Sequence, residues 1–106
     1  MRHMTPRQLA DYLAKADPAP LLLDVREPWE YHICRVEDSV LIPMPTIPQA
    51  CQELDAARET VVICHHGVRS RAVASYLEQA GFTNVVNLSG GVAAWAREVD
   101  PKMPVY

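Results

Sequence analysis

Short apolar runs along the chain have the pattern of buried strands. Leu21 to Val25 is apolar except for one aspartate, and Val61 to Cys64 is apolar throughout. Because successive residues of a strand point to opposite faces of a sheet, unbroken apolar runs of this length indicate strands buried on both faces. Two further runs, Val40 to Ile42 and Val85 to Leu88, carry a similar signal. The pattern therefore predicts four short buried strands.

Helical spacing occupies most of the intervals between these runs. Thr5 supplies a hydroxyl N-cap and is followed by proline, so we expect a helix from about Pro6 to Ala16. Ser70 to Ala80 has apolar residues on one helical face, and Gly81 follows it as a terminating residue. The other helical segments are expected at about Ile47 to Ala57 and around Trp95.

Strands and helices alternate, which is typical of the α/β class with a mostly parallel sheet. Two segments depart from this alternation. Arg26 to Asp38 is charged and aromatic, with at most a turn or two of helix around Glu30, and the tail from Asp100 to Tyr106 is expected to be extended. The 106 residues fit a single domain, residues 1–106, without repeats or low-complexity linkers.

Charge and composition exclude several functions. The net charge is −3, whereas a nucleic-acid-binding surface is normally basic. No stretch approaches the ~18 apolar residues of a membrane span, and the N-terminus lacks the apolar run of a signal peptide. The three cysteines have no paired spacing, which favours free thiols in a reducing compartment. We expect a cytoplasmic monomer with neither nucleic acid nor membrane as a partner.

Cys64 ends the clearest apolar run, and a short loop, His65 to Arg69, separates it from the helix expected from Ser70. Ligands of open parallel sheets bind beyond the carboxyl ends of the strands. Gly67 gives the loop freedom to turn its N–H groups inward, and the helix N-terminus and Arg69 add positive charge. Each feature stabilises a thiolate relative to a thiol. Cys64 is therefore the candidate nucleophile.

Plainer interpretations of these residues exist. A cysteine at the end of a buried strand is often only a small core residue, but its combination with Arg69 favours catalysis. The adjacent His65 and His66 are poorly spaced for a shared metal ion, and no second cluster completes a site. We therefore expect no metal, and we expect the two histidines to shape the rim of the loop or to supply a proton.

Three motifs together resemble the rhodanese homology domain. Cys64-His65-His66-Gly67-Val68-Arg69-Ser70 is similar to the active loop of that family, and the segment Asp24 to Tyr31 resembles its Asp-x-Arg-x-x-x-Glu-[Tyr/Phe] signature. Gly81 to Trp95 resembles its closing strand, Gly-Gly turn and tryptophan helix. The resemblance covers nearly the whole chain. It implies a three-layer α/β/α fold around a five-stranded parallel sheet of order 1-5-4-2-3, with a fifth strand before Thr5.

One stretch departs from the family pattern. Relatives usually carry Gly-His-Ile-x-Gly-Ala before the strand that begins at Val40, whereas this chain has Cys34-Arg35-Val36-Glu37-Asp38-Ser39. We expect this difference to affect substrate access rather than chemistry. Cys34 is a candidate resolving thiol if its loop approaches Cys64; otherwise Cys34 and Cys51 take no part.

The resemblance implies sulfur transfer through Cys64. The thiolate would attack the outer sulfur of a donor such as thiosulfate, release sulfite and become a persulfide. Cyanide or a cellular thiol would then remove the outer sulfur of this persulfide. The loop from Cys64 to Arg69 would hold the persulfide through its N–H groups. Arg69 would bind the anionic end of the donor, and Ser70 could offer a hydroxyl. No metal or organic cofactor is required.

Two charged residues, Asp24 and Arg26, lie at the end of the first buried strand. Charges in such a position need partners. We expect the two side chains to pair with each other or with loop backbone, and to support the neighbouring loops rather than take part in catalysis.

Two other functions are compatible with the same fold. Phosphatases and arsenate reductases of this fold have arginine at the sixth position after the cysteine, whereas that position here is Ser70 and Arg69 comes one earlier. The smaller loop suits sulfur better than a tetrahedral phosphate. The second alternative is a catalytically silent module with a binding or regulatory role. Such modules typically lack the cysteine that is present here as Cys64.

Overall fold

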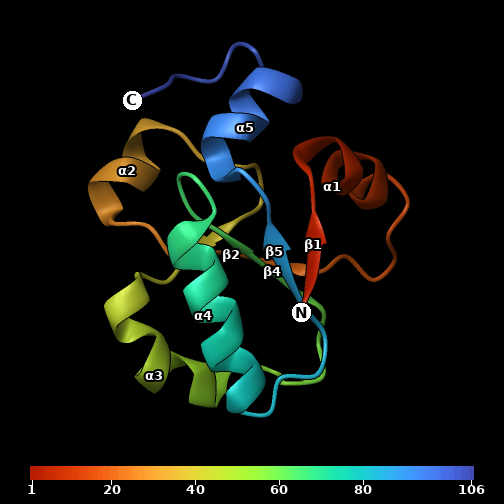
Figure 1. Ribbon diagram of the computed structural model, residues 1–106, viewed down its shortest axis with the longest axis vertical. Coiled ribbons are helices and arrows are strands. Elements are labelled where there is room, and N and C mark those ends of the chain that lie inside the picture. The colour runs from red at the N-terminus through yellow and green to blue at the C-terminus, as the bar shows by residue number, and fades with distance from the viewer.

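The computed structural model describes all 106 residues and contains one parallel sheet with helices on both faces (Figure 1). The strands lie in the order β1-β5-β4-β2-β3, and every neighbouring pair is parallel. The fold class and the strand order implied by the family resemblance are therefore confirmed. The strands are β1 (Arg2–Met4), β2 (Leu21–Asp24), β3 (Val40–Leu41), β4 (Thr60–Ile63) and β5 (Val85–Leu88). The helices are α1 (Pro6–Leu13), α2 (Pro28–Ile33), α3 (Ile47–Ala50), α4 (Val68–Gln79) and α5 (Gly91–Glu98), with 3-10 turns η1 (Met44–Thr46) and η2 (Cys51–Glu53).

The edge strand β1 is the element that hydrophobic periodicity could not indicate. It has three residues, mostly exposed, and pairs with β5 so that Arg2 lies opposite Val86 and Met4 opposite Leu88. The N–H of Ser89 extends this pairing by donating to the carbonyl of Met4 at 2.8 Å. Main-chain pairing to β5, rather than an apolar pattern, therefore places this strand.

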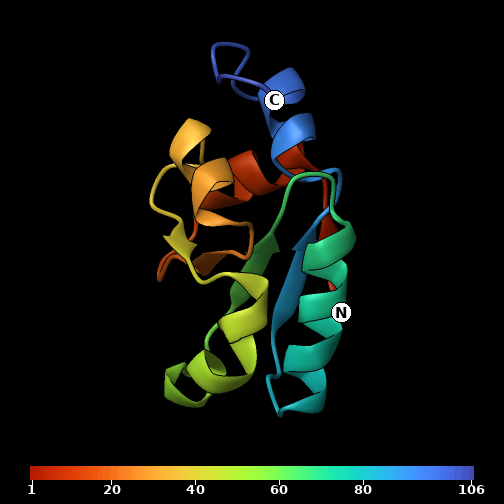
Figure 2. The ribbon, with the colours of Figure 1, turned by 90° about the vertical axis from the view of Figure 1, so that its left-hand side faces the viewer.

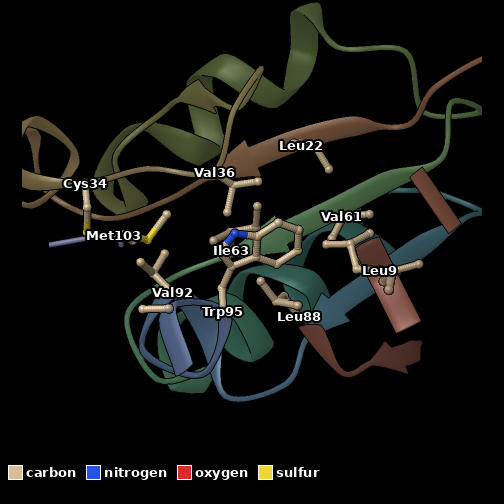
Figure 3. Close-up of a cluster of buried hydrophobic side chains, with 12 residues drawn as sticks. Leu9, Leu22, Cys34, Val36, Val61, Ile63, Leu88, Val92, Trp95 and Met103 are labelled. Carbon is tan, nitrogen blue, oxygen red and sulfur yellow. The ribbon is translucent and has the colours of Figure 1, made fainter. Parts of the chain in front are cut away.

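Side chains along the central strands alternate between two separate cores. Val61 and Ile63 of β4 face the layer formed by α1 and α5, whereas Val62 faces the layer formed by α3 and α4. Trp95 of α5 lies at the centre of the first core, against Ile63 and Val61 (Figure 3). The strands run toward the end of the molecule where α2, α5 and the C-terminal tail gather (Figure 2). The carboxyl edge of the sheet is therefore surrounded by these three segments.

The helix expected from Ile47 to Ala57 is shorter in the structure. α3 ends at Ala50, η2 follows, and Leu54 is already extended. The carboxylate of Asp55 accepts a hydrogen bond from the N–H of Ala57 at 2.9 Å. This local interaction competes with helical hydrogen bonding and ends the segment.

The C-terminal tail was predicted to be extended, but part of it forms a turn. The N–H of Met103 donates to the carbonyl of Asp100 at 3.0 Å, which forms a turn after α5. Met103 packs into the core on the α5 side, and the chain then continues toward α2, where Figure 1 shows its end. No helix in the chain combines the length and the apolar character needed to cross a bilayer.

Candidate active site

The loop between β4 and α4 closes around the sulfur of Cys64. This residue directly follows β4 and is only 1% exposed, so its thiol lies at the base of the loop. Gly67 has a φ of 96°, and its N–H donates to Cys64 Sγ at 3.0 Å. A side chain at this position would be strained and would press on the backbone of Gly90. The glycine is therefore needed for the main-chain donor to reach the sulfur.

The N-terminus of α4 lies directly behind this donor. The helix begins at Val68, two residues before the predicted start at Ser70, and has 12 residues. The first N–H groups of a helix lack partners within it and, with the helix dipole, favour negative charge nearby. The early start puts Ser70 in the first turn, fully buried, with its hydroxyl 3.3 Å from Cys64 Sγ.

The Gly90–Gly91 turn at the start of α5 supports the loop from the other side. The N–H of Val92 donates to the carbonyl oxygen of Cys64 at 2.8 Å, and that of Ala93 to the carbonyl oxygen of His65 at 3.0 Å. The second glycine has a φ of 60°, and a Cβ there would overlap both carbonyl oxygens. The Gly-Gly motif is therefore a contact surface for the loop as well as a turn.

Arg69 forms a two-point ion pair with Glu30 of α2. Its terminal nitrogens lie 2.6 and 2.9 Å from the two carboxylate oxygens. Glu30 is buried, and hydrogen bonds from Arg69 lower the pKa of its carboxyl to about 2. The same interaction raises the pKa of Arg69. The guanidinium expected to meet an anionic donor is thus anchored by α2, while 34% of its side chain remains exposed.

Glu30 is a site residue to which the sequence analysis gave no role. Besides Arg69, its carboxylate accepts hydrogen bonds from the N–H of Glu27 at 2.9 Å and from the hydroxyl of Tyr106 at 2.8 Å. The one signal in the sequence was its place in the Asp-x-Arg-x-x-x-Glu signature. That motif indicates a family position but not the partner, which lies 39 residues further along the chain.

Arg26 extends this cluster into the protein. It is fully buried and pairs with Asp24 at 2.8 Å, in the arrangement expected from the sequence. It also donates to the backbone carbonyl of Cys34 at 2.6 Å and to the hydroxyl of Tyr106 at 2.8 Å. The Asp24–Arg26 pair therefore connects the end of β2 to the following loop and to the C-terminal tail.

Tyr106 brings the C-terminal tail against the loop that follows β4. Its ring centroid lies 4.2 Å from that of His65 and 5.6 Å from that of Trp29. Its hydroxyl lies between Arg26 and Glu30, and burial raises the pKa of the phenol to about 12. No periodic pattern marks such a residue, so its place at the site could not be predicted from local spacing.

The other predicted loop residues form the rim of the site. His65 is half-buried, its Nδ1 has no hydrogen-bond partner, and burial lowers the pKa of its imidazole. His66 is exposed, and Val68 is 77% exposed. Histidine, cysteine, aspartate and glutamate side chains form no group of three or more that could hold a metal ion.

Cys34 and Cys64 lie in different cores of the molecule. Cys34 belongs to the core between the sheet and α5, where Figure 3 shows it beside Met103. Cys64 belongs to the core on the other side, as does Cys51. The central sheet separates these two cores, so the structure does not support Cys34 as a resolving thiol for Cys64.

Comparisons with known proteins identify the family. A family model described as "Rhodanese-like domain" matches residues 5–98, so the chain belongs to the rhodanese-like domain family. A rhodanese-like domain protein from Staphylococcus aureus, solved by crystallography, is 31% identical with a TM-score of 0.84, covering 100% of this chain and 99% of that chain.

Several curated relatives have names that refer to sulfur transfer. A protein named "Sulfurtransferase" from Allochromatium vinosum is 40% identical over 77 residues, covering 73% of this chain and 72% of that protein. "Probable adenylyltransferase/sulfurtransferase MoeZ" from Mycobacterium tuberculosis is 36% identical over 105 residues, covering 97% of this chain. This chain spans only 26% of the length of that second relative.

Proposed function

We propose that the protein moves sulfane sulfur from thiosulfate or a small persulfide donor to a thiol or cyanide, and carries it as a persulfide on Cys64. The observation that carries this proposal is the N–H of Gly67, 3.0 Å from Cys64 Sγ at the N-terminus of α4. A sulfur atom added to Cys64 would be surrounded by the loop and the first turn of that helix. Main-chain donors and the helix dipole in such a place stabilise the charge of a persulfide.

The chemistry consists of two displacements at sulfur. The Cys64 thiolate attacks the outer sulfur of thiosulfate, so a new S–S bond forms while the old one breaks and sulfite leaves with the electron pair. Cys64 then carries a terminal sulfur with one negative charge. A thiolate or cyanide attacks this terminal sulfur in turn, and the Cys64 thiolate leaves. Both steps balance without an external oxidant or reductant, and no cofactor is needed.

Loop length separates this proposal from phosphoryl chemistry on the same fold. Arg69 is the fifth residue after Cys64 and points to Glu30, while the sixth residue, Ser70, is fully buried against the sulfur. A tetrahedral phosphate needs room and several donors around its oxygens. The small loop, closed by a serine, favours sulfur as the group that is transferred.

The proposal extends to how the protein works in the cell. Three free cysteines are consistent with a reducing compartment, and we propose the cytoplasm. We further propose that it acts as a monomer on small molecules, without nucleic acid or membrane. Light scattering of the purified protein would measure its oligomeric state, and a stable dimer would contradict the proposed monomer.

The decisive experiment treats the protein with thiosulfate and measures the mass of the Cys64 peptide. We expect an added mass of ~32 Da, one sulfur atom on the nucleophile, and its loss after cyanide is supplied. Cys64→Ser removes both results, whereas the matched variant Cys51→Ser retains them. If the folded wild type neither gains the sulfur nor produces thiocyanate, the protein is a silent module, and the proposal is wrong.

A further inference from the structure

A chain of polar side chains leads from Cys64 to the edge of the sheet. Cys64 Sγ lies 3.3 Å from Ser70 Oγ, which lies 2.5 Å from Oδ1 of Asn87 on β5. Nδ2 of Asn87 lies 3.3 Å from Nδ1 of His3 on β1. Asn87 is only 3% exposed. A buried amide in a central strand needs polar partners, and here one of them leads to the nucleophile.

The single hydroxyl hydrogen of Ser70 is directed away from the sulfur. The separation of 2.5 Å between Ser70 Oγ and Asn87 Oδ1 is at the short end of the range for an O–H···O bond and is too short for an N–H donor. An amide oxygen only accepts, and a serine has one hydrogen to donate. Ser70 therefore donates to Asn87 and presents lone pairs to Cys64. This geometry suits a thiol that donates to Ser70, but it gives a thiolate no hydrogen bond from that hydroxyl.

The strand β1 lies on the other side of the Asn87 amide. Asn87 lies opposite His3 in the β1–β5 register, and its nitrogen faces Nδ1 of the imidazole. Turning the amide by half a rotation would place its nitrogen 2.5 Å from Ser70 Oγ, which is short for an N–H donor, whereas the contact with His3 fits either orientation because the imidazole has two tautomers. Asn87 therefore keeps its acceptor, not its donor, on the Ser70 hydroxyl.

We propose that Asn87 is a positioning residue that keeps the Ser70 hydroxyl hydrogen from Cys64, and thereby favours the thiol and the persulfide over the free thiolate. In the thiol the inner sulfur is neutral, and in the persulfide the charge is on the outer sulfur. Only the free thiolate places the charge on Sγ, where a hydroxyl donor would matter most. The effect on the persulfide rests on the proposed function, whereas the effect on the thiolate is independent of that function.

This arrangement makes the thiolate scarcer but more reactive. A thiolate of higher basicity is a stronger nucleophile and a poorer leaving group. Cys64 would then attack a sulfur donor faster once ionised, and would keep the added sulfur longer. Arg69 interacts with Cys64 through its charge and is itself paired with Glu30, and His65 and His66 follow Cys64 in the loop. The facing turn of Gly90 to Val92 has no titratable side chain.

The test replaces Asn87 by leucine, which has nearly the same shape and no acceptor. The rate at which iodoacetamide alkylates Cys64 is measured against pH on the Cys64 peptide. In this reaction the thiolate sulfur displaces iodide, and the thiol proton has gone to water. We expect the midpoint pH of the rate profile to fall by about 0.5–1 unit, because Ser70 becomes free to donate to the thiolate. The rate at the high-pH plateau should fall about twofold.

The control is the same substitution in a Ser70→Ala background, where Asn87→Leu should produce no further shift. An unchanged or higher midpoint in folded Asn87→Leu overturns the proposal, as does an equal shift without Ser70. If thermal melting shows that Asn87→Leu is unfolded, Asn87→Val, which also lacks an acceptor and suits a strand, takes its place. Alkylation requires no sulfur donor, so failure here is distinguishable from failure of the sulfur-transfer experiment.

Discussion

Replacing Glu30 by glutamine would test whether the buried ion pair with Arg69 stabilises the fold around the site. The carboxylate accepts two hydrogen bonds from Arg69, one from the N–H of Glu27 and one from Tyr106. Glutamine keeps the shape and one acceptor oxygen, but it loses the charge and places an NH₂ group against one of these donors. Glu30→Gln should therefore be destabilising.

The size of the effect follows from the pKa of Glu30. The carboxyl has a pKa of about 2 instead of its ordinary 4.5. At ~1.4 kcal/mol per unit, this shift corresponds to at most about 3.5 kcal/mol. Because 34% of the Arg69 side chain is exposed, solvent screens part of the interaction. We therefore expect the free energy of unfolding at neutral pH to fall by about 1–2 kcal/mol.

The pH dependence provides the sharper readout. The pKa is lower in the folded state, so the stabilisation is complete above the unfolded value of 4.5 and is lost as the pH falls toward 2. Between these values the wild type should lose about 1–2 kcal/mol more than Glu30→Gln. Urea unfolding at several pH values measures the free energy of unfolding of the wild type and of Glu30→Gln.

A surface carboxylate provides the matched control. Glu37 is exposed, and Glu37→Gln should change the free energy of unfolding by less than about 0.5 kcal/mol. At neutral pH the Tm of Glu30→Gln should fall by about 4–16 °C. If wild type and Glu30→Gln lose stability in parallel between pH 5 and pH 2, the argument for the ion pair is refuted.

Two glycines and the C-terminal tyrosine allow further tests by thermal or urea unfolding. Gly91→Ala should lose at least ~3 kcal/mol, because its Cβ would overlap two carbonyl oxygens of the catalytic loop. Gly81→Ala should lose only about 1–2 kcal/mol, because its φ of 101° is strained but nothing lies within 4 Å of its Cβ; equal losses would contradict the steric argument. Tyr106→Phe removes the hydroxyl between Arg26 and Glu30 and should lose about 1–2 kcal/mol. An unchanged stability would show that the tail does not support the cluster.

Local pattern alone predicts most of the secondary-structure elements and their order along the chain. Four strands follow from apolar runs, but only β2, β4 and β5 are buried as predicted, because β3 lies at the edge of the sheet with Val40 exposed. The start of the first helix follows from Thr5 and Pro6, whose capping hydrogen bonds the structure contains. Boundaries were less predictable where side chains compete with the helix, as Asp55 does. β1 came from the family resemblance, because a short exposed edge strand leaves no hydrophobic signal.

The sequence by itself determined which groups the loop around Cys64 contains, since the strand, Cys64, Gly67, Arg69 and the following helix are neighbours along the chain. The tertiary structure alone decided which groups meet this loop. Arg69 finds Glu30, and Ser70 finds Asn87, across 39 and 17 residues. Such contacts depend on how parallel strands and their crossovers are arranged in space. The spacing of residues along the chain does not determine that arrangement.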